Sequence, residues 1–103
     1  MASYVIFIRE STRDHSELET YFQKAPAAMV GHAYRVHAAY GAYEVIEGPS
    51  VEGVAILEFP SYADAKAWYD SPAYVEAREY RFKGADYRAV IVEGFDPSTT
   101  LNS

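Results

Sequence analysis

Two histidines and two arginines are the side chains of this sequence best suited to chemistry on a small molecule. His32 and His37 could move a proton, because histidine titrates near neutral pH. Arg35 and Arg81 could hold an anion, since a guanidinium group matches the geometry of a carboxylate or an enolate. Each of these side chains could instead have a purely structural role. A histidine near a helix end can simply interact favourably with the helix dipole, and an arginine can pair with a nearby carboxylate.

Aromatic side chains could form the walls of a pocket around these groups. Trp68, the only tryptophan, is followed by Tyr69 and then by Ser71-Pro72, and Tyr43 lies elsewhere in the chain. A serine before a proline is typical of a helix cap followed by the first helical turn, so one helix should end here and another begin. The bend would leave Trp68 and Tyr69 beside a gap, although both rings could equally be core packing.

Several other kinds of chemistry are disfavoured by the sequence. There is no cysteine, which excludes disulfides, thiol catalysis and cysteine-type zinc sites. His32 and His37 are five residues apart and belong to different predicted elements, and no H-x-x-x-H or histidine–carboxylate signature appears, so no metal site is predicted. No phosphate-binding loop, dinucleotide fingerprint or serine nucleophile elbow is present. We therefore expect no metal and no cofactor.

The composition predicts one small globular domain. The chain has 103 residues, half of them apolar, and a formal net charge of −6 without a basic cluster. This charge argues against binding to nucleic acids or to anionic membranes. No stretch has the length of a signal peptide or a membrane span, so a cytoplasmic location is expected.

The expected elements follow the order β-α-β-β-α-β. Strands are predicted from β-branched and aromatic runs, and helices from apolar spacing and caps. Gly41 should mark a bulge or kink before 42–47. The order is that of a ferredoxin-like α+β fold with an antiparallel sheet, forming a domain at 1–96 with a flexible tail at 97–103. The predicted segments are strands at 4–10, 33–40, 53–59 and 86–94, and helical regions at 15–24, 26–30 and 61–83.

Both faces of the predicted sheet are apolar. In the first strand Tyr4, Ile6 and Ile8 alternate with Val5 and Phe7, and the third and fourth strands alternate in the same way. Two helical regions can cover only one face. The other face would be a large exposed apolar patch, and a second copy of the chain is its simplest cover.

The run "EFPSYADAKAWYDSPAYVEAREYR" closely resembles the matching segment of the domain-of-unknown-function-1330 family, within the dimeric α+β barrel superfamily. "YVIFI", "EVIEG" and "VIVEG" fit the same pattern, and the resemblance covers nearly the whole chain. It implies a homodimer whose sheets pack face to face. It implies no settled activity, because the superfamily includes cofactor-free monooxygenases, haem enzymes, isomerases and proteins that only bind.

The chain departs from the family pattern between the first helix and "EVIEG". Arg35 keeps a basic residue of the pattern, but a second arginine is replaced by Ala39 and a glycine by Tyr40. If that arginine holds a ligand in the family, this chain binds a different ligand or binds it differently.

We therefore predict a small-molecule protein with one pocket per subunit, between the helices and the sheet beside Ser71-Pro72. The substrate class would be a small aromatic or carbonyl acid, and the reaction would need no cofactor. The alternative is a non-catalytic small-molecule-binding or structural homodimer, so whether the chain is an enzyme is left open. The side chains assigned are His32 and His37 for proton transfer, and Arg35, Tyr43, Trp68, Tyr69 and Arg81 for substrate binding.

Overall fold

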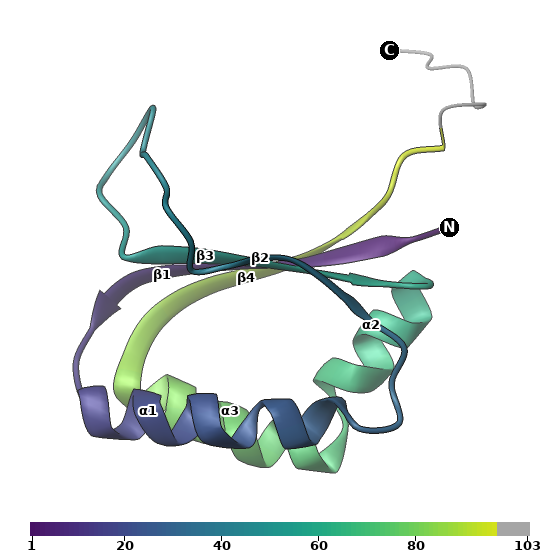
Figure 1. Cartoon of the computed structure of the whole chain (residues 1–103), viewed down its shortest axis with the longest axis horizontal. Helices are drawn as coiled ribbons and strands as arrows, with labels where there is room; N and C mark the ends of the chain where they lie inside the picture. The colour runs from purple at the N-terminus through teal and green to yellow at the C-terminus, as the bar shows by residue number, and fades with distance from the viewer. Residues whose placement is uncertain (97–103) are drawn as a thin grey trace.

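The chain folds into a four-stranded antiparallel sheet with its helices on one side (Figure 1). The computed structural model describes residues 1–96, and the predicted flexible tail at 97–103 lies outside them. The ferredoxin-like β-α-β-β-α-β order is confirmed, with a 3-10 turn after the first helix. The elements are β1 (Ser3–Thr12), α1 (His15–Lys24), η1 (Pro26–Met29), β2 (Arg35–Ala39), β3 (Gly53–Phe59), α2 (Tyr62–Tyr69), α3 (Pro72–Gly84) and β4 (Ala85–Glu93).

The strands lie in the order β2-β3-β1-β4, so β2 and β4 are the edges. Val5 of β1 is the register partner of Leu57 in β3 and of Ile91 in β4. Partners of this kind share one face of the sheet. This face packs against the helices and carries the buried residues Val5, Phe7, Ala55 and Phe59.

Local capping explains where the helices begin. The Asp14 side chain accepts hydrogen bonds from backbone N–H groups of the first turn of α1, and Ser61 does the same for α2. Ser71 caps α3, and Pro72 occupies its first turn. The helix break expected at Ser71-Pro72 is therefore confirmed.

The link between β2 and β3, residues 40–52, contains no strand, and it rises from the sheet on the side opposite the helices (Figure 1). The chain leaves β2 at Tyr40, whose φ of 58° lies in the left-handed region that bulky residues seldom adopt. The change of direction expected at Gly41 therefore occurs one residue earlier. Tyr40 is held in this conformation by contacts described below.

The sheet face opposite the helices is apolar and partly open. Tyr4, Ile6 and Ile8 of β1 lie half-buried on it, while Val90 and Val92 of β4 are 55% and 46% exposed. Figure 1 shows no helix on this side of the sheet. Within residues 1–96, no helix is both long and apolar enough to cross a membrane.

Candidate functional site

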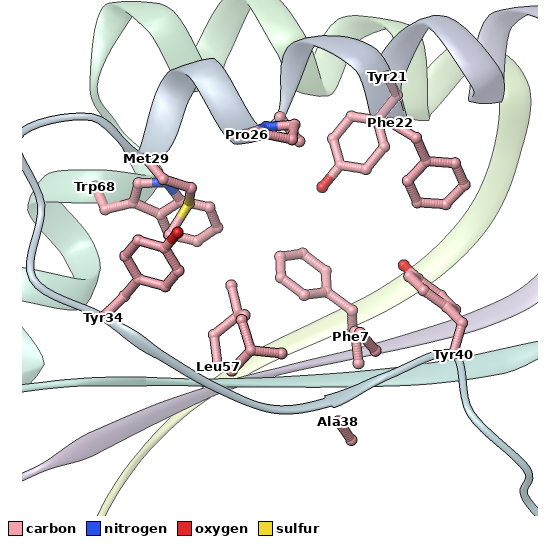
Figure 2. A pocket seen from close by; sticks show the side chains of 14 residues that line it. Phe7, Tyr21, Phe22, Pro26, Met29, Tyr34, Ala38, Tyr40, Leu57 and Trp68 are labelled. Atoms are coloured by element: carbon pink, nitrogen blue, oxygen red, sulfur yellow. The ribbon is translucent and has the colours of Figure 1, made fainter.

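A cavity of about 260 Å³ lies between the helical layer and the β2 side of the sheet. Figure 2 shows its floor of sheet residues, its roof from the first helical segments, and aromatic rings at both ends. The walls are almost entirely apolar. They are made by Phe7, Tyr21, Phe22, Ala25, Pro26, Met29, Tyr34, Val36, Ala38, Ala39, Tyr40, Ala55, Leu57 and Trp68.

The cavity exists because small side chains face a raised roof. Ala55 of β3 lies opposite Phe7 of β1, leaving space above the sheet where a larger residue would fill it. Pro26 begins η1, and this short turn carries Met29 over the β2 edge. Because β2 is an edge strand, the exposed Val36 and its neighbours mark the mouth of the cavity.

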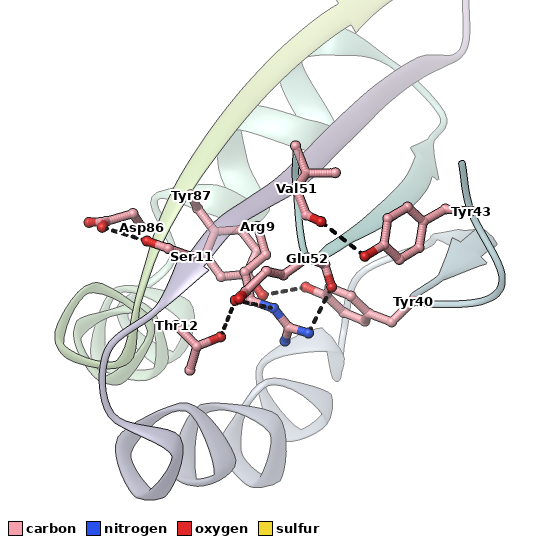
Figure 3. A network of polar contacts seen from close by, with 9 residues as sticks. All are labelled: Arg9, Ser11, Thr12, Tyr40, Tyr43, Val51, Glu52, Asp86 and Tyr87. Carbon is pink, nitrogen blue, oxygen red and sulfur yellow. Dashed lines mark hydrogen bonds and ion pairs between the residues drawn. The ribbon is translucent and has the colours of Figure 1, made fainter. Parts of the chain in front are cut away.

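Tyr40 closes one end of the cavity (Figure 2). Its hydroxyl oxygen lies 2.7 Å from that of Tyr87, and its ring packs edge-on against Phe22 at 5.3 Å between centroids. The Arg9 guanidinium lies 5.2 Å from the ring centroid and also bonds the Glu52 carbonyl oxygen (Figure 3). These contacts fix the ring despite the strained backbone. Burial, and then the bond to Tyr87, raise the pKa of Tyr40.

Tyr21 of α1 provides a second phenol, which points into the cavity (Figure 2). Its hydroxyl oxygen lies 2.7 Å from that of Tyr74 in α3. Burial raises the pKa of Tyr21, and Tyr74 adds to the rise. Both Tyr21 and Tyr40 therefore stay protonated at neutral pH and can donate hydrogen bonds, but neither can act as a base there.

Trp68 is the predicted site residue that lines the cavity. It is 1% exposed and stacks on Phe59 at 5.1 Å between centroids. Tyr69 faces a separate, smaller hollow beside β4, and its ring lies under the Arg78 guanidinium at 4.3 Å. The helix break therefore separates the two neighbouring aromatic residues instead of bringing both into one pocket.

Arg81 is buried behind the cavity and does not line it. It is 2% exposed, and aromatic rings surround its guanidinium: those of Phe7, Tyr21, Phe82 and Tyr87 lie 4.9 to 5.8 Å away. Among residues 1–96 no carboxylate oxygen lies within ion-pair distance of it. Within the described residues, Arg81 therefore does not form the structural ion pair with a carboxylate that was the alternative to anion binding.

The remaining predicted residues lie away from the cavity. His37 Nε2 is 2.6 Å from Glu58 Oε1, and its ring packs against Tyr4 on the open face of the sheet. Arg35 is exposed on β2, with Glu58 as its register partner. His32 is half-buried just beyond η1. The structure does not bring these residues together, and their proton-transfer and anion-binding roles stay predictions.

Tyr43 belongs to the 40–52 loop rather than to the cavity. Its hydroxyl donates a hydrogen bond to the Val51 carbonyl oxygen at 2.9 Å, which ties one arm of the loop to the other (Figure 3). The loop forms a second hollow, of about 310 Å³, with Ile8 and Val54 on the open face of the sheet.

The sequence alone does not indicate the roof of the cavity. Tyr21 lies in the predicted helical region 15–24, and Pro26 and Met29 lie in the region 26–30, where their residue types suggest only packing. A signal was nevertheless present, because Ala39 and Tyr40, where the chain departs from the family pattern, both line the cavity. If the replaced arginine holds a ligand in the family, the substitution therefore falls on the cavity wall.

The wall chemistry suits an uncharged or weakly polar ligand. The lining contains no cationic or anionic side chain, so a buried charge would have no direct partner there. An apolar cavity of roughly 150 Å³ holds a benzene molecule, so this larger one has room for about two fused rings. Among residues 1–96 no cluster of three or more histidine, cysteine or carboxylate side chains could hold a metal ion.

Comparison with known families finds one match. The family described as "Domain of unknown function (DUF1330)" matches residues 2–95. A comparison with curated proteins finds no match.

Solved structures of similar fold come from several bacteria. A protein of unknown function from Rhodopseudomonas palustris is 19% identical, with a TM-score of 0.70 over 93% of this chain and 84% of that one. A dimeric protein of ferredoxin-like fold from Bacteroides fragilis is 17% identical, with a TM-score of 0.59 over 90% and 96%. SnoaB, described as a cofactor-independent oxygenase from Streptomyces nogalater, is 7% identical, with a TM-score of 0.57 over 96% and 97%. At these identities the likeness shows the fold alone.

Proposed function

The chain belongs to the DUF1330 family, and we propose that it is a homodimeric protein that binds a small aromatic molecule in the cavity between α1, η1 and the β2 side of the sheet. The observation that carries the proposal is the lining of this cavity. Aromatic rings stand at both ends, aliphatic side chains form the floor, and the polar groups within it are few. Ligand pockets in proteins have this character.

Two features support an aromatic rather than an aliphatic ligand. Phe7 and Trp68 line the cavity from the sheet and from α2, and Tyr34 and Tyr40 stand at opposite ends (Figure 2). Rings arranged in this way offer both faces and edges to a flat ligand. An anionic group on the ligand would have to stay at the mouth, because the interior has no cation.

A binding measurement tests the proposal directly. Trp68 is the only tryptophan and lines the cavity, so an occupant should quench its fluorescence. We expect 2-acetylnaphthalene, a two-ring probe, to bind the wild-type chain in a saturable manner. Ala39→Phe, which places a ring in the cavity, should weaken that binding at least tenfold. The matched control is Ala63→Phe on the exposed surface of α2, which should bind as the wild type does.

Equal binding by the wild type and Ala39→Phe would contradict the proposal, as would the absence of saturable binding to the wild type. Thermal unfolding of each variant shows whether a loss of binding comes from a filled cavity or from an unfolded chain.

A cofactor-independent reaction on the bound molecule is the second candidate function. Its support is the fold shared with the oxygenase SnoaB, and the phenols of Tyr21 and Tyr40, which could donate hydrogen bonds to a reacting oxygen. The non-catalytic alternative is supported by the absence of a basic side chain from the cavity lining. An oxygen electrode separates the two: uptake of dioxygen with 1-naphthol and the purified chain supports the enzyme, and binding without uptake supports the binding protein.

The homodimer is supported by the open sheet face and by the fold neighbour described as dimeric. Burying apolar surface is worth about 25 cal/mol per Å², so an open face that carries Ile6, Ile8 and Val90 favours a second copy as its cover.

A further inference from the structure

A buried cluster of polar groups lies beside the cavity. Arg81 and Tyr74 belong to α3, and Tyr21 belongs to α1. These three side chains are 2%, 0% and 6% exposed. Of the three, Tyr21 alone lines the cavity, and its hydroxyl group is directed into it (Figure 2). The cavity therefore contacts one member of a buried polar cluster that contains a positive charge, since the Arg81 guanidinium lies 5.8 Å from the centroid of the Tyr21 ring.

The buried guanidinium needs oxygen acceptors, because it is always charged and can only donate hydrogen bonds. Among residues 1–96 it has no carboxylate partner. Burial works against its charge, yet the pKa of Arg81 is raised, because the phenols of Tyr74 and Tyr21 outweigh the effect of burial. The Tyr74 phenol contributes more to this rise than that of Tyr21 and is thus an acceptor that Arg81 can use.

The hydrogen bond between Tyr21 and Tyr74 can run in either direction, and the charge of Arg81 distinguishes the two. A phenol has one proton to donate and can accept hydrogen bonds at its oxygen. If Tyr74 turns its oxygen toward Arg81, its own proton points to the Tyr21 oxygen, 2.7 Å away. The opposite order would turn the Tyr74 proton toward the cation. Electrostatics favours the first order, in which Tyr21 keeps its proton for the cavity.

We infer that Tyr21 is a specificity-determining hydrogen-bond donor, polarised by Arg81 through Tyr74, and that it selects aromatic ligands carrying a carbonyl oxygen. A carbonyl suits the site because it accepts the phenol proton and brings no charge into an apolar cavity. A carboxylate would gain a single donor there and lose its hydration. This inference rests on the proposed binding function and names the ligand class.

A pair of probes of matched shape tests the inference. 2-Acetylnaphthalene and 2-isopropenylnaphthalene differ only in replacing C=O by C=CH₂. We expect the wild type to bind the ketone about three- to tenfold more tightly than the alkene, as one buried hydrogen bond of ordinary strength predicts. Tyr21→Phe should remove this preference while its affinity for the alkene stays within about twofold. Tyr62→Phe, which removes an exposed phenol outside the cavity, is the matched control and should keep the preference.

The order of the hydrogen bonds has its own test. In the inferred order, Tyr74 donates to Tyr21, so Tyr74→Phe leaves the Tyr21 proton available to the ligand. The substitution removes the group that polarises the Tyr21 hydroxyl, so the affinity for the ketone should stay the same or fall slightly. If Tyr21 instead donates to Tyr74 in the wild type, Tyr74→Phe should release the Tyr21 proton and strengthen ketone binding. Stronger binding would therefore overturn the inferred order.

Failure of the inference differs from failure of the proposed function. If neither naphthalene binds the wild type, the proposed function is wrong. If both bind equally and Tyr21→Phe changes neither affinity, the cavity is a binding site but Tyr21 does not select its ligand. Thermal unfolding of all three phenylalanine variants, monitored by circular dichroism, confirms that each remains folded under the conditions of the titration.

Discussion

The side-chain hydroxyl of Ser71 donates a hydrogen bond to the backbone carbonyl oxygen of Trp68 at 2.7 Å. The Ser71 hydroxyl oxygen also accepts a hydrogen bond from the backbone N–H of Tyr74 at 3.4 Å. One hydroxyl thus closes α2 and begins α3. Trp68, whose carbonyl oxygen is bonded in this way, forms a wall of the cavity. The hydroxyl group of Tyr74 is hydrogen-bonded to that of Tyr21. The proline break therefore connects the helical layer to the site.

Replacing this serine should weaken the fold. Ser71→Ala removes the cap of α3, and we expect the free energy of unfolding to fall by about 1 kcal/mol. Ser71→Asn should recover part of the loss, because asparagine is also a good cap. Urea unfolding measures both changes. The control is Ser50→Ala in the exposed loop, which should have no effect. Equal stability of Ser71→Ala and the wild type would show that Pro72 alone sets the break.

The features that could be predicted from the sequence depend on neighbouring residues. Ser71-Pro72 specifies a helix start within four residues, and the alternation of Val5 and Phe7 with Ile6 and Ile8 predicts a strand with two apolar faces. Neither inference requires knowledge of how distant segments pack. These predictions, and with them the ferredoxin-like order, are accordingly confirmed.

The site could not be predicted in the same way, because its contacts join distant segments. Tyr21 and Tyr74 are 53 residues apart, and Tyr40 and Tyr87 are 47 apart. Ten tyrosines are available, and no local pattern indicates which of them pair. When site residues are chosen by residue type, charged and titratable side chains are selected instead. The cavity is made mainly by residues whose type suggests only packing.

Alkaline pH should destabilise the protein through its buried tyrosines. The pKa values of Tyr21, Tyr40 and Tyr74 are raised in the fold, with burial as the largest cause, whereas an unfolded tyrosine titrates at 10.0. Their contribution is therefore fully present below about pH 10 and is lost as the pH rises further. Each such group should lower the free energy of unfolding by about 1.4 kcal/mol per pH unit above that point.

The double variant Tyr21→Phe/Tyr74→Phe makes this prediction specific. Urea unfolding between pH 10 and about pH 11.5 should give a shallower decline than in the wild type. Tyr62→Phe, which changes an exposed side chain, should keep the wild-type slope. Parallel slopes for the wild type and the double variant would show that these phenols do not control the alkaline limit.

A charge on the open face of the sheet should dissociate the proposed homodimer. Val90 is 55% exposed at this face, and Val90→Lys would place an ammonium group against a second copy. We expect sedimentation velocity at micromolar concentration to give a dimer for the wild type and a monomer or unfolded chain for the variant. Ala67→Lys, on the exposed side of α2, should remain a dimer. A wild-type chain that is folded and monomeric would exclude the dimer.

The last prediction concerns the length of the ligand. Tyr40 closes one end of the cavity with a ring held by Tyr87, Phe22 and Arg9, on a backbone whose φ of 58° favours glycine. Tyr40→Gly should open that end and relieve the backbone strain while removing the three contacts. We expect the variant to bind 2-acetylanthracene, a three-ring ketone, at least tenfold more tightly than the wild type does. Its affinity for 2-acetylnaphthalene should fall, because one wall is lost. Tyr40→Phe is the control, since it keeps the ring and loses only the bond to Tyr87, and it should retain the two-ring preference. If fluorescence titration gives the same ratio of three-ring to two-ring affinity for the wild type and Tyr40→Gly, Tyr40 does not set the length of the cavity.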